Sequence, residues 1–157
     1  MDLNKLSLGD KIVAGAGIVL FLFLLILPWH SVTVDFGEFG GEHTETVGAL
    51  SSQGGFGVPW PAYLVILLLI ALVAVVLVRK LTTTDLPELP IPWRQAIFYG
   101  SIAVPVLLLL KLILETDYLA FWAYLDILIG IGIAYGGFLI SQEADEPAAG
   151  TAPPTPF

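Results

Sequence analysis

Two ionisable side chains, Lys111 and Asp126, lie well inside long apolar stretches of this chain. A charge in the hydrocarbon region of a membrane is costly, so such residues are usually paired or face a polar cavity. If the chain turns back at Thr116 and Asp117 as a helical hairpin, Lys111 comes to the level of Ala123, about one helical turn from Asp126. The spacing therefore predicts an intramembrane polar pair, which is the kind of chemistry that ion or proton transport requires.

A purely structural interpretation of the same two residues stays open. The lysine stem is long enough to carry its ammonium group toward the membrane surface, where Glu115 follows four residues later. Asp126 is then a buried polar group that accepts hydrogen bonds on its own.

A second set of chemically capable side chains falls in residues 29–60, namely His30, Asp35, Glu38, Glu42, His43 and Glu45. Imidazole nitrogens and carboxylate oxygens are ligands for divalent metals. The run from Glu42 to Glu45 matches neither a helical zinc motif nor a calcium-binding loop. We therefore predict a solvated acidic surface there, with no metal site and no cofactor.

The glycine-rich run at residues 130–137 superficially resembles a dinucleotide-binding motif. It follows no predicted strand and lies inside an apolar stretch, which argues against that function. Gly132 and Gly136 instead form a small-xxx-small face that lets another helix approach closely, with Ala14 and Gly17 as its counterpart. That helix belongs either to the same chain, which we favour, or to a second copy.

Pro105 lies midway along the third apolar stretch. A proline inside a helix leaves one backbone carbonyl, here that of Ser101, without its usual partner, so the sequence predicts a helix kink. A kink can serve as a hinge, although membrane helices also tolerate proline for structural reasons.

Four apolar stretches carry these residues, at about 11–27, 61–78, 95–114 and 118–140. About 20 apolar residues are needed to cross about 30 Å of hydrocarbon as a helix. The chain of 157 residues is 57% hydrophobic and 13% charged, which is more apolar material than a soluble domain of this size buries. The predicted fold class is an all-α membrane protein, a four-transmembrane-helix bundle that crosses the plasma membrane several times.

The basic residues predict how the bundle is oriented, because Lys and Arg near helix ends stay on the cytoplasmic side. They precede the first stretch or fall between the second and third: Lys5, Lys11, Arg79, Lys80 and Arg94. We therefore place residues 1–10, the inner loop 79–94 and the tail 141–157 in the cytoplasm, and the outer loop 29–60 outside. The tail is rich in Pro, Ala, Glu and Thr, a composition typical of disorder.

The outer loop shows a strand pattern. Apolar and polar residues alternate over 31–36, three glycines follow, and residues 44–47 resume the pattern. This predicts a short β-hairpin lying over the helix ends.

Composition argues against several function classes. The net charge of −8, with six basic residues, argues against nucleic-acid binding. The chain has no cysteine, which excludes disulfides, thiolate metal sites and iron–sulfur clusters. No histidine in an apolar stretch, paired nucleophile and base, or phosphate-binding loop is recognisable, so we expect no enzymatic activity.

Several short segments in order carry a resemblance: Lys5-Leu6-Ser7 and Gly9-Asp10-Lys11, then Leu27-Pro28-Trp29, then Tyr135-Gly136-Gly137. In these marks the chain resembles uncharacterised four-helix membrane proteins of actinobacteria over nearly its whole length. The resemblance implies the four-helix fold in a bacterial cell membrane and no particular activity.

Two functions are compatible with these features. We expect an accessory or scaffold subunit that sits in the lipid bilayer and binds other membrane proteins, or copies of itself, through helix faces or the acidic loop. The alternative is a small oligomeric transporter or channel in which Asp126, Lys111 and the Pro105 kink are the working parts. The sequence does not identify a small-molecule substrate.

Overall fold

A computed structural model describes residues 3–52, 58–82, 86–87 and 89–143 of the protein. Four helices account for most of them: α1 (Leu8–Ile26), α2 (Trp60–Leu81), α3 (Trp93–Leu114) and α4 (Phe121–Ser141). Between α1 and α2 lie two strands, β1 (Pro28–Asp35) and β2 (Glu42–Gly48), which form an antiparallel pair. The four predicted helices and the predicted hairpin are thus confirmed. The tail predicted to be disordered lies outside the described residues from 144 onward.

All four helices are long and apolar enough to cross a membrane. At about 1.5 Å per residue, helices of 19 to 22 residues span the about 30 Å of a bilayer's hydrocarbon. Only 33–39% of each apolar window is buried inside the bundle, so most of each helix surface is free to contact lipid. The fold is therefore compatible with an integral membrane protein.

The helix ends follow from local chemistry. The Ser7 side chain accepts a hydrogen bond from the backbone N–H of Asp10, and the Asp10 side chain accepts one from the N–H of Ser7. This capping box lets α1 begin three residues before the predicted start. Helix α4 begins later than predicted because Tyr118, with φ of 56°, takes a left-handed turn conformation that no α-helix contains.

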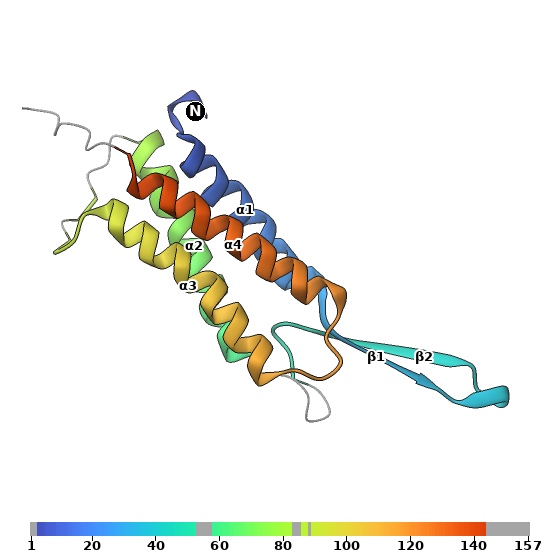
Figure 1. Ribbon diagram of the computed structural model, residues 1–157. Helices are drawn as coiled ribbons and strands as arrows, with labels where there is room; N and C mark the ends of the chain where they lie inside the picture. Colours follow the sequence, from blue (N-terminus) through green and yellow to red (C-terminus); the bar gives the residue numbers. More distant parts are fainter. Residues whose placement is uncertain (1–2, 53–57, 83–85, 88, 144–157) are drawn as a thin grey trace, which may run out of the picture.

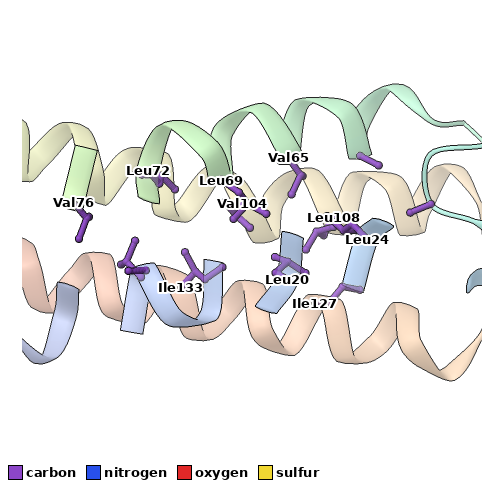
Figure 2. Packing of buried hydrophobic residues seen from close by; sticks show 14 of the residues in the cluster. Leu20, Leu24, Val65, Leu69, Leu72, Val76, Val104, Leu108, Ile127 and Ile133 are labelled. Atoms are coloured by element: carbon purple, nitrogen blue, oxygen red, sulfur yellow. The ribbon is translucent and has the colours of Figure 1, made fainter. Parts of the chain in front are cut away.

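The helices form a bundle in which each packs against two others (Figure 1). Helix α4 lies between α1 and α3, while α2 contacts α1 and α3. Side chains from all four helices meet along the bundle axis, as Figure 2 shows. They include Leu20 and Leu24 of α1, Val65 and Leu69 of α2, Val104 and Leu108 of α3, and Ile127 and Ile133 of α4.

The hairpin projects away from the bundle (Figure 1). The prediction that it lies over the helix ends was wrong, because only the first residues of β1 are buried and the strand is exposed from Thr33 onward. Its register pairs Thr33 with Thr44 and Asp35 with Glu42. At the tip, Gly37 takes a positive φ that side chains rarely adopt, and its N–H donates to the Asp35 carboxylate at 2.8 Å. We refer to the end of the bundle from which the hairpin projects as the hairpin end.

The orientation of the bundle in the membrane remains a prediction from the basic residues, and labelling tests it. The native chain has no cysteine, so single cysteines introduced at the exposed positions Ser52 and Gln95 give no background. A membrane-impermeant maleimide is expected to label Ser52→Cys in intact cells and Gln95→Cys only after permeabilisation. Labelling of Gln95→Cys in intact cells contradicts the predicted orientation.

Candidate functional site

A buried ion pair lies at the C-terminal end of α3, at the hairpin end of the bundle. The Lys111 ammonium Nζ donates to the Glu115 carboxylate Oε2 at 2.7 Å, and the two residues stand one helical turn apart. Lys111 is 1% exposed and Glu115 6%, so water can satisfy little of either charge. Nζ also donates to the Val58 carbonyl at 3.1 Å and lies 5.1 Å from the centre of the Trp29 ring, within cation–π range. A buried pair of this kind is stable only when further hydrogen bonds compensate its lost hydration.

The Glu115 carboxylate also makes polar contacts with two other parts of the chain. Its Oε2 also lies 2.9 Å from Nε2 of His30, which is 3% exposed. Its Oε1 accepts a hydrogen bond from the backbone N–H of Val58, just before α2. One carboxylate thus joins α3, the base of β1 and the approach to α2. We call this group of five residues the Glu115 cluster: Trp29, His30, Val58, Lys111 and Glu115.

Backbone pairing holds His30 in place. The start of β1 runs beside the connection between α3 and α4, where Ser31 N–H donates to the Tyr118 carbonyl and Ala120 N–H donates to the Trp29 carbonyl, both at 2.9 Å. His30 itself forms a β-bridge with Leu119. The base of the hairpin therefore has a third paired segment, whereas its outer part has only β1 and β2 among the described residues.

The structure gives Lys111 a different partner from the Asp126 that depth alone suggested. Among the residues that the structure describes, the polar bonds of Lys111 go to Glu115 and Val58. Asp126 is 3% exposed on the buried face of α4, and its Oδ1 has no hydrogen-bond partner within the described part of the chain. The structural interpretation left open for Lys111, with Glu115 as its partner, is the arrangement observed.

The two predicted packing glycines have different surroundings. A Cβ atom on Gly136 would lie 2.8 Å from Cγ2 of Ile12 and 2.9 Å from Cγ2 of Val13, so α1 approaches α4 closely there. A Cβ on Gly132 would meet nothing within 4 Å. Gly17, expected to face α4, instead approaches Val73 of α2. The contact between α1 and α4 therefore involves Gly136 but neither Gly132 nor Gly17.

Pro105 lies inside α3, which continues through it from Trp93 to Leu114. It is buried against α4, where a Cβ on Gly130 would lie 3.4 Å from its Cα. Ser101 Oγ donates to the carbonyl of Ile97 at 2.7 Å. The predicted kink remains a prediction, and the packing gives Pro105 a structural place at the α3–α4 contact.

The acidic loop divides into two environments. Five residues lie exposed on the outer part of the hairpin: Asp35, Glu38, Glu42, His43 and Glu45. His43 Nε2 and Glu45 Oε1 lie 3.8 Å apart in that exposed setting. No group of three or more potential metal ligands comes together in the described segments. Of these six ionisable side chains in the loop, only that of His30 is buried.

Sequence reasoning missed the role of His30 and named Glu115 only as an alternative partner. The spacing of Lys111 and Glu115, four residues apart, was a visible signal for a helical ion pair. His30 and Glu115 are 85 residues apart, and nothing local in the sequence marks their contact.

No protein-family model, curated protein or solved structure matches this chain. The resemblance to actinobacterial four-helix proteins therefore stays an expectation.

Proposed function

We propose that this protein is a non-enzymatic scaffold of the plasma membrane that presents an acidic β-hairpin outside the cell to a partner membrane protein with a basic surface. The observation that carries this proposal is the hairpin itself, which projects beyond the bundle while its base is fixed by the buried Glu115 cluster (Figure 1). A hairpin anchored in this way at its base presents its outer strands at a defined place relative to the helices.

The charge of the hairpin indicates the chemistry of its partner. Residues 28–52 contain four carboxylates and no lysine or arginine. The carboxylates are exposed, and beside them Val34 is 46% and Phe36 63% exposed. Exposed apolar side chains amid like charges suit a protein partner of opposite charge, because complementary charges steer association while the apolar groups are buried on contact.

The unpaired strand edges support the same proposal. Beyond the base, the described sheet has only β1 and β2, so each strand has one edge without a neighbour. Free edges without lysine are open to pairing with another chain, and many protein complexes form by adding a strand in this way.

A second candidate is a small oligomeric transporter or channel, and one observation favours it. Asp126 is buried in the bundle, and one of its carboxylate oxygens has no partner among the residues that the structure describes, a feature typical of intramembrane sites that act on ions or protons. Lys111, the other residue expected to act there, is engaged by Glu115. The mass of the purified protein in detergent separates the candidates, since the transporter requires a self-assembled ring or dimer and the scaffold does not.

Photo-crosslinking at the hairpin tests the scaffold directly. A photoreactive amino acid at Phe36 in the full-length protein in intact cells is expected to give a discrete protein adduct that weakens at high salt. Neutralising Asp35, Glu38, Glu42 and Glu45 to the corresponding amides is expected to reduce the adduct about tenfold, the combined effect of a few exposed ion pairs.

Asp117 provides the matched control, because it is exposed at the hairpin end but lies outside the hairpin. Asp117→Asn is expected to leave the adduct unchanged. A neutralised hairpin that crosslinks as well as the native one, or a probe that captures only lipid, counts against the proposal.

A further inference from the structure

His30 makes two polar contacts that a neutral imidazole cannot satisfy together. Its Nδ1 lies 3.2 Å from the backbone carbonyl of Asp117, and its Nε2 lies 2.9 Å from Oε2 of Glu115. A carbonyl oxygen only accepts hydrogen bonds, so the first contact requires a hydrogen on Nδ1. A neutral imidazole then has a bare lone pair on Nε2, which faces the carboxylate oxygen.

One additional proton resolves this conflict. It lies either on Nε2, giving an imidazolium beside a carboxylate, or on Glu115, giving a carboxylic acid that donates to a neutral imidazole. Both arrangements hold the same number of protons. Without that proton one of the two contacts becomes a repulsion between lone pairs, and at 3% exposure of His30 little water is at hand to relieve it.

We propose that His30 is a proton-controlled latch for the hairpin. With the proton bound, His30 connects β1 through its side chain both to Asp117 of the α3–α4 connection and to Glu115 of α3. When the proton is lost, one of these two contacts breaks. The base of β1 then keeps the other contact and its backbone bonds to the α3–α4 connection, so the hairpin gains freedom relative to the bundle. Because both contacts are satisfied only with that additional proton bound, acid favours the closed latch and alkali favours the open one.

The surrounding charges explain why the hairpin loosens while the bundle does not. Lys111 and Glu115 of α3 lie beside the imidazole, with the Lys111 ammonium bonded to the same carboxylate oxygen. Across β2, the residue paired with His30 is the uncharged Val47, and the segment before α2 contributes only the backbone of Val58. After the proton leaves, Lys111 still neutralises Glu115, so the ion pair that closes the bundle persists.

Two further acidic groups lie nearby and do not contact the imidazole through their side chains. Asp117 offers its backbone carbonyl while its residue is exposed, and Asp126 of α4 has no bond to the Glu115 cluster among the described residues. Tyr118, also on the connection, is exposed. Among the described residues, the charged side chains at the latch are therefore those of Glu115, which contacts His30, and Lys111, which contacts Glu115.

Distance measurement between spin labels tests the latch without reference to any partner. Labels on cysteines at Thr44 of β2 and Tyr124 of α4, both exposed, report the position of the hairpin relative to the bundle in the full-length protein in lipid nanodiscs. A narrow distance distribution is expected at acidic pH, and loss of that narrow distribution is expected at alkaline pH. An unchanged distribution at the two pH values overturns the proposal.

The chain contains two histidines, which supply a matched control. His43 is exposed on the hairpin, so His43→Gln is expected to retain the pH response, whereas His30→Gln and Glu115→Gln are expected to abolish it. A pH response that survives His30→Gln and disappears in His43→Gln overturns the proposal.

Nitrogen NMR of the two imidazoles in the unmodified chain covers the case in which a His30 variant fails to fold. In acid, His30 is expected to have both ring nitrogens protonated or to share a proton with Glu115, and in alkali it is expected to lack that proton. Loss of the proton with no change in the spin-label distances, or no loss between acid and alkali, overturns the latch.

Discussion

Replacing Glu115 with alanine is expected to lower the free energy of unfolding by about 3–5 kcal/mol, the usual cost of removing one partner from a buried ion pair. The change leaves the Lys111 ammonium with the Val58 carbonyl as its one hydrogen-bond acceptor among the described residues, and it removes the acceptor for the backbone N–H of Val58. It also leaves Nε2 of His30 without a partner. The effect is measured by unfolding the protein in mixed detergent micelles while the helical circular-dichroism signal is monitored.

A double-mutant cycle distinguishes this ion pair from a general loss of packing. Lys111→Met is expected to destabilise strongly by itself, because it strands the carboxylate. The double variant Lys111→Met with Glu115→Ala is expected to cost less than the sum of the two single changes. Lys111→Met combined with Asp126→Asn is expected to be additive, since the structure joins Lys111 to Glu115 and not to Asp126.

The pair formed by Lys80 and Glu143 is the matched control at the opposite end of the bundle. Nζ and Oε2 lie 3.9 Å apart there, and both side chains are less buried than those of Lys111 and Glu115. Glu143→Ala is expected to cost about 1 kcal/mol or less. If Glu115→Ala is no more damaging than Glu143→Ala, the Glu115 cluster does not stabilise the hairpin end.

Gly136→Leu is expected to destabilise the bundle by about 1–3 kcal/mol or more, the usual cost of overpacking a filled core. Its new side chain would begin less than 3 Å from atoms of Ile12 and Val13, so α1 and α4 must move apart. Gly132→Leu, four residues away on the same helix, is expected to be neutral or slightly stabilising, because it meets no neighbour and leucine favours helix over glycine. Thermal unfolding in detergent compares the two variants directly.

Equal effects of the two substitutions contradict the packing at Gly136. If both variants destabilise equally, the loss comes from the shared change of residue type rather than from the contact with α1. If neither does, α1 does not approach α4 as closely as the distances at Gly136 indicate.

The elements of this fold were predictable because each depends on a local pattern. An apolar run of about 20 residues indicates a spanning helix wherever it occurs, and the alternation after Pro28 indicates a strand. The capping box at Ser7 and Asp10 is also local, and the structure contains it. The exact helix ends were harder, because the left-handed turn at Tyr118 depends on how the connection pairs with β1.

The contacts between elements were less predictable, because depth in the membrane does not fix the direction in which a side chain points. Lys111 and Asp126 were placed at similar depth, yet Lys111 bonds to Glu115 on its own helix. One oxygen of Asp126 has no partner in the described ranges of the chain. The same holds for glycine. The spacing of Gly132 and Gly136 allowed both to face α1, but the rotation of α4 about its axis brings only Gly136 there.

The wide separation of His30 and Glu115 along the chain sets an order on biosynthesis. The ribosome adds His30 85 residues before it reaches Glu115, an interval of roughly 4–17 s at the usual rates of elongation. During that time the newly made strands have neither α3 nor the α3–α4 connection to anchor them. A nascent chain released before α3 is inserted therefore carries an unanchored hairpin, and only the full bundle holds β1 in its final position.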